Sequence, residues 1–285
     1  MEFQRYESDQ LLSIIKNKHF LLDSMKSILS DIQVGKKSLI FIDPFCGSGV
    51  VSRVATSLNM SVIANDAEYF SYLVNSVYLT LKKEDLFSMF SFMGGIDAYY
   101  SYLNMSGLYS STSGYIDGKS FISRHYAPLD TQNIRDKKER LFYSRENALF
   151  IDGVRNEIEN SFRDGRISEN EKNIVIASLL YQALKSANIS GTFTSYHKQI
   201  VGNYTSVKKR VTQGMNLLVP MLSDTISSTS GVCNMDAIEF VSSQIEWQND
   251  KSTGRIQVDL TGEKQQHLEK QLGFTRGKVR FSVIT

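Results

Sequence analysis

The sequence has little cysteine, little proline and no long apolar run, and each shortage excludes a class of protein. No C-x-x-C pair or Cys/His cluster accompanies its two cysteines, Cys46 and Cys233, which argues against a zinc site or a disulfide scaffold. No apolar window of about 18 residues is present, and residues 1–10 are polar and acidic, so neither a membrane span nor a signal peptide is expected. We therefore expect a reduced, cytoplasmic protein without a metal site.

An excess of charge of one sign is also missing. The chain carries 32 Lys and Arg against 30 Asp and Glu, giving a net charge of +2. Such a balance permits a nucleic-acid partner without requiring one, so any DNA-binding surface must be local. At 285 residues and 41% hydrophobic content, the chain is long enough for one large domain or two modest ones with a buried core.

What is present is a compact pattern between Ser38 and Asp66, SLIFIDPFCGSGVVSRVATSLNMSVIAND. Its short apolar runs at 39–42 and 61–64 predict buried strands, and the spacing over 50–58 predicts a helix between them. The order strand, glycine turn, helix, strand and acid is typical of the first half of a doubly wound nucleotide-binding sheet.

The glycine turn of this pattern allows two interpretations. Gly47 and Gly49 let a ligand approach the backbone without a Cβ clash, at the start of a helix with unpaired N–H groups; they also suit a plain tight connection. We favour the ligand because Asp43 and Asp66 flank the turn. A dinucleotide fingerprint would need a third glycine where Ser52 stands, and no P-loop G-K-[ST] follows.

The DPFCGSG segment resembles motif I of the S-adenosylmethionine-dependent amino-methyltransferases that modify DNA bases. The resemblance extends to Asn65-Asp66, where the family's acid holds the cofactor ribose, and to Asn17-Lys18 before Leu21-Leu22, which is similar to motif X although Lys16 replaces its usual glycine. It implies S-adenosylmethionine as cofactor and contacts from Lys18, Asp43, Phe45, Gly47, Gly49, Asp66, Asp236 and Ala237. From the residues alone, Asp236 is equally a helix N-cap after a short strand at 231.

Helical spacing recurs along the rest of the chain. It predicts one or two helices over 10–32, a sheet-covering helix over 70–81, and helices over 147–160 and 169–187. The stretch 87–120 is rich in Ser, Gly and Tyr without a clear period, and we expect a connection there rather than core. A loop before residue 147 mixes cations with aromatic residues, although such a charge run is usually a solvated surface.

The resemblance also implies a fold and a domain order. We expect an α/β, Rossmann-like methyltransferase sheet with a mainly helical DNA-recognition insert. Residues 1–85 would form the first half of the cofactor domain, 86–228 the insert, and 229–285 the return to the sheet with a strand-helix-strand tail. Cations and small residues suit phosphate contacts, and the expected DNA contacts are Arg124, Lys198, Lys208, Lys209 and Arg210.

One family motif is missing from the chain. The family's catalytic tetrapeptide contains Pro-Pro followed by an aromatic residue. Its polar first residue bonds the amino group that is methylated, and its aromatic ring stacks on the flipped base. None of the three prolines here precedes another. No catalytic residue is therefore assigned. The implied reaction is methyl transfer to the exocyclic amino group of adenine in duplex DNA. Three explanations stay open: a second polypeptide supplies the motif, the site is divergent, or the chain is a non-catalytic DNA-binding or specificity subunit of a restriction-modification complex.

Overall fold

The computed structural model describes residues 6–11, 22–35, 39–116, 118–132, 139–189, 195–197 and 211–242. Their regular elements are, in chain order, α2 (Leu22–Gln33), β1 (Ile40–Asp43), α3 (Val50–Ser57), β2 (Ser61–Asn65), α4 (Tyr69–Thr80), η2 (Lys83–Phe87), η3 (Ser91–Met93), α5 (Ile96–Ser113), α6 (Phe121–His125), α7 (Arg145–Arg163), α8 (Glu169–Ser186) and β3 (Gly231–Cys233). Residues 237–242 are helical as well. The predicted tail after residue 243 lies outside the described residues.

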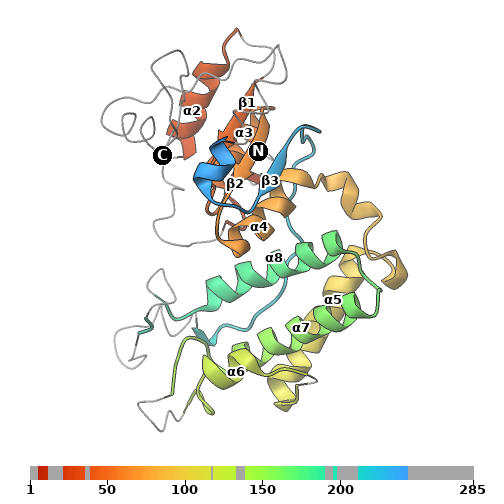
Figure 1. Cartoon of the computed structure of the whole chain (residues 1–285). Coiled ribbons are helices and arrows are strands. Elements are labelled where there is room, and N and C mark those ends of the chain that lie inside the picture. Colours follow the sequence, from red (N-terminus) through yellow and green to blue (C-terminus); the bar gives the residue numbers. More distant parts are fainter. Residues whose placement is uncertain are drawn as a thin grey trace.

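A parallel sheet of order β1-β2-β3 forms the upper part of the molecule in Figure 1. Asp43 lies beside Ala64, and Asn65 lies beside Cys233, so the three strands end at the same edge. The central strand β2 is almost wholly buried, as expected for a strand covered on both faces. Helix α3 contacts β1 and β2, and α4 contacts β2 and β3. The predicted strand, helix and strand between Ser38 and Asp66 are confirmed.

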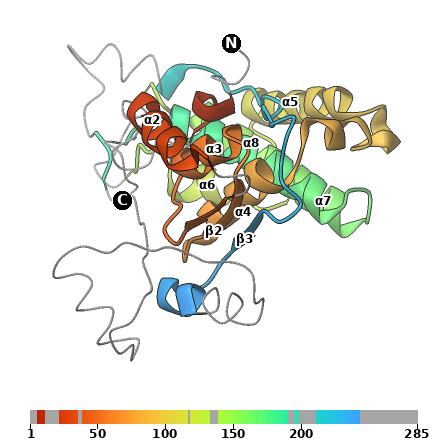
Figure 2. The ribbon, with the colours of Figure 1, turned by 90° about the horizontal axis from the view of Figure 1, so that it is seen from above.

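The helices α5, α7 and α8 form a second layer, with α8 lying between the sheet and the other two (Figure 1). The views from the front and from above both show α5 and α7 projecting on the side away from α2 (Figure 2). Helix α8 packs on α4, and one hydrophobic cluster runs from α4 through all three helices. Within the described ranges, no helix is both long and apolar enough to cross a bilayer.

The expectation of a connection over 87–120 was wrong. Helix α5 spans 18 residues of this stretch and buries Tyr99, Tyr100 and Leu103. Its period is hidden because its buried face carries polar and small residues: the Tyr100 hydroxyl is bonded to Ser178 Oγ at 2.8 Å, and Gly107 lies against α7. A face that mixes Tyr, Ser and Gly gives no clear apolar stripe in the sequence.

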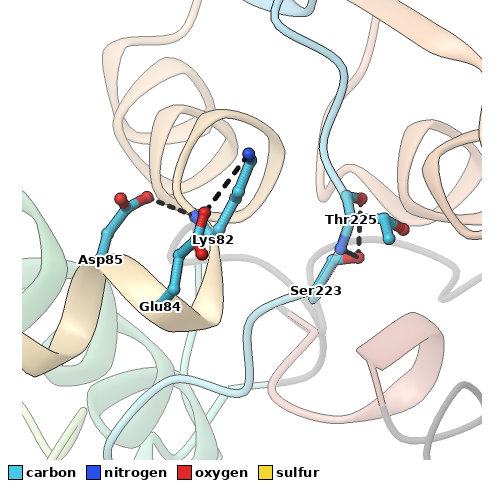
Figure 3. Close-up of polar contacts among 5 residues, drawn as sticks. All are labelled: Lys82, Glu84, Asp85, Ser223 and Thr225. Carbon is cyan, nitrogen blue, oxygen red and sulfur yellow. Dashed lines mark hydrogen bonds and ion pairs between the residues drawn. The ribbon is translucent and has the colours of Figure 1, made fainter.

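The chain leaves the sheet layer for the helical layer and returns from it at neighbouring points. Lys82 forms a parallel bridge with Ser223, and the Lys83 N–H donates to the Ser223 carbonyl at 3.0 Å. Asp85 accepts from the Lys82 N–H at 2.7 Å and Glu84 pairs with the Lys82 ammonium at 3.4 Å, while Ser223 bonds Thr225 on the returning segment (Figure 3). Adjacent exit and return points fit an insert, and the division at residues 85 and 228 stays a prediction.

Candidate functional site

Three carboxylates lie at or just beyond the ends of the three strands. Asp43 is the last residue of β1, Asp66 directly follows β2, and Asp236 comes three residues after β3. The carboxyl edge of a parallel sheet, with helices starting beside it, is where α/β proteins bind nucleotide ligands. The structure therefore brings together the acids that the sequence predicted from separate segments.

The glycine loop between β1 and α3 is fastened to the carboxylate after β2. Asp66 accepts the Gly47 N–H on Oδ2 at 2.7 Å and the Glu68 N–H on Oδ1 at 2.9 Å. Each carboxylate oxygen can accept a second hydrogen bond. A Cβ built on Gly47 meets no atom within 4 Å, so the space above this glycine is open. Asp66 thus fixes the loop while keeping acceptor capacity for a ligand.

Asp43 and Phe45 border the same loop. Ser52 Oγ, in the first turn of α3, donates to Asp43 Oδ2 at 2.6 Å. The Phe45 ring is 71% exposed although it lies between two structured elements. Burial, then Asp43 and then Asp66, raise the pKa of the Cys46 thiol, so this thiol stays neutral. An apolar ring and two carboxylates therefore border the loop, and the cysteine inside it is buried.

Asn75 of α4 supports the loop from behind and was not predicted from the sequence. Its Nδ2 donates to the Gly47 carbonyl at 2.9 Å, to Cys46 Sγ at 3.2 Å and to the Ser71 carbonyl at 2.9 Å. A Cβ on Gly49 would lie 1.9 Å from Asn75 Oδ1. The only sequence signal was a polar residue on the buried stripe of a helix, since Asn75 is 1% exposed.

Asn65 and Asn234 join the three strand ends. The buried Asn65 side chain donates to the carbonyls of Pro44 and Met235 at 3.2 and 3.1 Å and accepts the Met235 N–H at 3.1 Å. Asn234 Nδ2 donates to the Asp66 and Ala67 carbonyls at 2.7 and 3.0 Å. The sequence placed Asn65 only as the neighbour of Asp66. These two amides hold the acids of β1, β2 and β3 in fixed relative positions.

The N-cap interpretation of Asp236 is confirmed. Its Oδ1 accepts the Ile238 N–H at 2.8 Å and the Glu239 N–H at 3.4 Å, and the helix begins at Ala237. Such a cap satisfies two of the helix's orphan donors. Asp236 is exposed, so a ligand contact through its other oxygen stays a prediction.

The predicted DNA contacts are mostly outside the described residues. Lys198, Lys208, Lys209 and Arg210 lie there, as does the predicted cofactor residue Lys18. Arg124 is described, and it lies on helix α6 rather than on the expected loop. Asp152 of α7 accepts the Ile122 and Ser123 N–H groups at 2.9 and 2.8 Å. Helix α6 is thus fixed on α7, at the end of the molecule opposite the sheet (Figure 1).

Among the described residues, no group of three or more His, Cys, Asp or Glu side chains could hold a metal ion.

A family model described as D12 class N6 adenine-specific DNA methyltransferase matches residues 17–230. The chain belongs to this family. The match covers the glycine loop, both residues of the Asn65-Asp66 pair and the helical layer, and it ends just before β3.

The curated relatives of this chain are named modification methylases or type II methyltransferases. It is 30% identical over 182 residues to modification methylase LlaI of Lactococcus lactis subsp. lactis, covering 64% of this chain and 26% of the relative. Type II methyltransferase M.NlaIII of Neisseria lactamica is 29% identical over 161 residues, covering 56% and 41%. M.FokI of Planomicrobium okeanokoites is 26% identical over 187 residues, covering 66% and 27%. The chain therefore spans less than half the length of these relatives. No solved structure matches it.

Proposed function

We propose that this D12 chain forms the cofactor-binding and DNA-recognition part of a restriction-modification methyltransferase. The reaction is transfer of a methyl group from S-adenosylmethionine to the exocyclic amino group of adenine in duplex DNA. The observation that carries the proposal is the Asp66 carboxylate bonded to the Gly47 N–H at 2.7 Å, at the carboxyl edge of a parallel sheet within a family of adenine-specific DNA methyltransferases.

The charges at this edge favour S-adenosylmethionine over a phosphate-bearing nucleotide. Asp43, Asp66 and Asp236 would repel a pyrophosphate, whereas a sulfonium is a cation that carboxylates attract. The Asp66 oxygens keep lone pairs that suit a ribose diol. In this proposal Asp66 holds the ribose, Asp43 and Phe45 border the methionine end, and Asp236 with Ala237 lies at the adenine.

The arrangement of the parallel sheet also supports a more specific fold. We propose a Rossmann-like, doubly wound sheet, because β1 and β2 are parallel and joined through α3, as in a nucleotide-binding half. In that arrangement β1 and β2 belong to its first half, and β3 belongs to the return of the chain to the sheet. The helical layer of α5 to α8 then acts as the insert that contacts DNA, with exposed Arg124 on α6 available to a backbone phosphate.

The residues that would complete methyl transfer are not assigned. None of Pro44, Pro128 and Pro220 precedes a second proline, so no residue of this chain takes the role of the family's Pro-Pro motif. We propose that a second polypeptide segment supplies it. The alternative is a non-catalytic DNA-binding or specificity subunit, favoured by the same missing motif.

Calorimetry with S-adenosylhomocysteine, the reaction's product form of the cofactor, tests the cofactor site. We expect binding by the native chain, and binding about tenfold to a hundredfold weaker in Asp66→Ala, since a hydrogen bond to a charged group contributes about 1.5–3 kcal/mol. Asp164→Ala is the matched control, because it removes a carboxylate 58% exposed on the far layer. Equal binding by native and Asp66→Ala chains would exclude this site.

A methylation assay on adenine-containing duplex DNA separates the two functional alternatives. The chain is assayed alone and then with the product of any adjacent gene that carries a Pro-Pro-aromatic motif. Methylation that requires both polypeptides supports the proposed function. Cofactor binding with no methylation in either mixture supports the non-catalytic subunit.

A further inference from the structure

An arginine lies fully buried in the helix that begins at the glycine loop. Arg53 of α3 is 1% exposed. Its guanidinium lies between two tyrosine rings, with Cζ 4.9 Å from the Tyr6 centroid and 4.1 Å from the Tyr78 centroid. Stacking on aromatic faces is what arginine does better than lysine. The two tyrosine rings therefore suit this side chain.

The guanidinium holds a short segment before the sheet, residues 6–11, which we call the N-terminal segment. Arg53 donates to the Tyr6 carbonyl and, at 2.9 Å, to the Asp9 carbonyl. No ion pair of Arg53 occurs among the described residues. Burial lowers the pKa of Arg53, which Tyr78, Tyr6, Asp9 and Glu7 partly offset.

The N-terminal segment is also bonded to elements other than α3. The Tyr6 hydroxyl donates to the Tyr78 carbonyl at 2.5 Å, and the Tyr78 hydroxyl donates to Gln10 Oε1 at 2.7 Å. Gln10 Nε2 donates to the Val219 carbonyl at 3.0 Å. A core helix could pack here with apolar side chains, and burying a charge instead is costly. The arrangement fixes the path of the backbone, which apolar packing alone does not do.

The N-terminal segment ends beside the glycine loop. Leu11 is 5% exposed and belongs to one cluster with Met25 of α2 and with Val50 and Val51. Val50 and Val51 are the first residues of α3, directly after Gly49. Figure 2 shows the start of the segment beside α2 and α3. Leu11 thus packs at the start of α3, beside the glycine loop that borders the proposed cofactor site.

We propose that Arg53 is a positioning residue for the cofactor, which anchors the N-terminal segment so that Leu11 packs on Val50 and Val51, directly after the glycine loop. This inference rests on the proposed function. Arg53 touches no part of the cofactor site itself; it acts through the carbonyls of Tyr6 and Asp9.

Calorimetry with S-adenosylhomocysteine on Arg53 variants, combined with hydrogen exchange of residues 6–11, tests the proposal. We expect Arg53→Met to weaken binding at least tenfold and to speed exchange in the segment. Arg53→Lys should give an intermediate loss, because an ammonium keeps the charge without the planar group that stacks on Tyr6 and Tyr78. Gln10→Ala loosens the same segment without disturbing the buried charge, and it should weaken binding several-fold even if Arg53→Met fails to fold.

Ile158→Ala is the control for lost stability. Ile158 lies on α7, which packs on α5, α6 and α8, and it is 0% exposed. Its truncation should lower the melting temperature and leave the dissociation constant within about twofold, since the cavity lies in the helical layer. If the role of Arg53 were purely structural, Arg53→Met and Arg53→Lys would likewise lower the melting temperature and leave the dissociation constant within about twofold.

The outcomes separate this inference from the proposed function. Failure of the native chain to bind S-adenosylhomocysteine overturns both. Native-like affinity in Arg53→Lys and Gln10→Ala, with the native chain binding, overturns only the positioning role. Equal weakening by Ile158→Ala also overturns it, because loss of stability would then account for the effect.

Discussion

Gly47 and Gly49 are required for different reasons. Both have left-handed backbone angles, with φ of 53° and 77°. A Cβ on Gly47 would enter open space, while one on Gly49 would lie 1.9 Å from Asn75 Oδ1. Gly47 is thus limited by its backbone alone, and Gly49 is limited by its backbone and by Asn75.

Alanine at the two glycines should therefore have unequal effects on stability. We expect Gly47→Ala to cost about 1–2 kcal/mol, the usual penalty of a left-handed alanine. Gly49→Ala should cost roughly 3 kcal/mol or more, because Asn75 must also give up hydrogen bonds to the loop. Urea unfolding of both variants measures the difference. Equal losses would contradict the close approach of Asn75 to Gly49.

At this scale the sequence predicted the acids and glycines and missed the amides. Asp43, Gly47, Gly49 and Asp66 stand in a local pattern whose spacing reports their position beside a turn. Asn75 is 28 residues from Gly47, and the two meet only because α4 packs back on the sheet. A contact between distant residues leaves no spacing in a single sequence, so its partners were not predictable.

At the scale of elements, α5 and α7 approach through small residues. A Cβ on Gly107 of α5 would lie 2.5 Å from the Phe150 ring, and one on Gly153 of α7 would lie 2.3 Å from Ser110 Oγ. Both glycines are in helix interiors, where glycine disfavours folding by about 1 kcal/mol relative to alanine. Close packing of the two helices explains why alanine is absent there.

Adding a methyl group at this contact should separate the helices. We expect Gly107→Ala and Gly153→Ala each to destabilise the protein by about 1–3 kcal/mol, the range for overpacked cores, despite their better helix propensity. Gly214→Ala is the control, because its Cβ meets no atom within 4 Å. Thermal unfolding followed by circular dichroism ranks the stabilities of the three variants and the native protein. A stabilised Gly107→Ala variant would show that propensity outweighs packing here.

Helix caps, apolar spacing and the contact between α5 and α7 together explain which helices were predictable. Helices α7 and α8 have Ser144 and Ser168 as N-caps, each with a side chain accepting a backbone N–H, and both follow regular apolar spacing, so their bounds were predicted within a few residues. Helix α5 carries Gly107 and Ser110 where a partner helix sits close. The small residues of α5 fit its close contact with α7, and they leave no regular apolar stripe in its sequence.

At the scale of the whole molecule, the two layers share one core. Buried Leu73, Val74 and Val77 of α4 lie in the cluster that also holds residues of α5, α7 and α8. The exit and return of the helical layer are adjacent at Lys82 and Ser223, which the sequence indicated as an insert. That α5, α7 and α8 complete the core on α4 was not visible in the sequence, because burial on α4 does not tell which element covers it.

This shared core is rich in buried tyrosines, which makes the fold sensitive to base. Burial raises the pKa of Tyr6 to about 12, despite the opposing Arg53 guanidinium. Burial likewise raises the pKa of Tyr78, Tyr100 and Tyr143. The ordinary pKa is about 10. Because the folded state keeps these protons to higher pH, their stabilising contribution is complete below about pH 10 and is lost as the pH rises through the folded values.

We therefore expect the free energy of unfolding to fall steeply above about pH 10. Each tyrosine contributes a slope of up to about 1.4 kcal/mol per pH unit, so four together would remove roughly 5 kcal/mol by about pH 11, a large part of a typical stability. Urea unfolding across this range, with tyrosinate absorbance, should show ionisation and unfolding together. Tyr100→Phe should make the slope shallower by one proton, whereas Tyr115→Phe, at a ring that is 58% exposed, should leave it unchanged. Stability that stays constant up to about pH 11 would mean that these hydroxyls reach water in the folded protein.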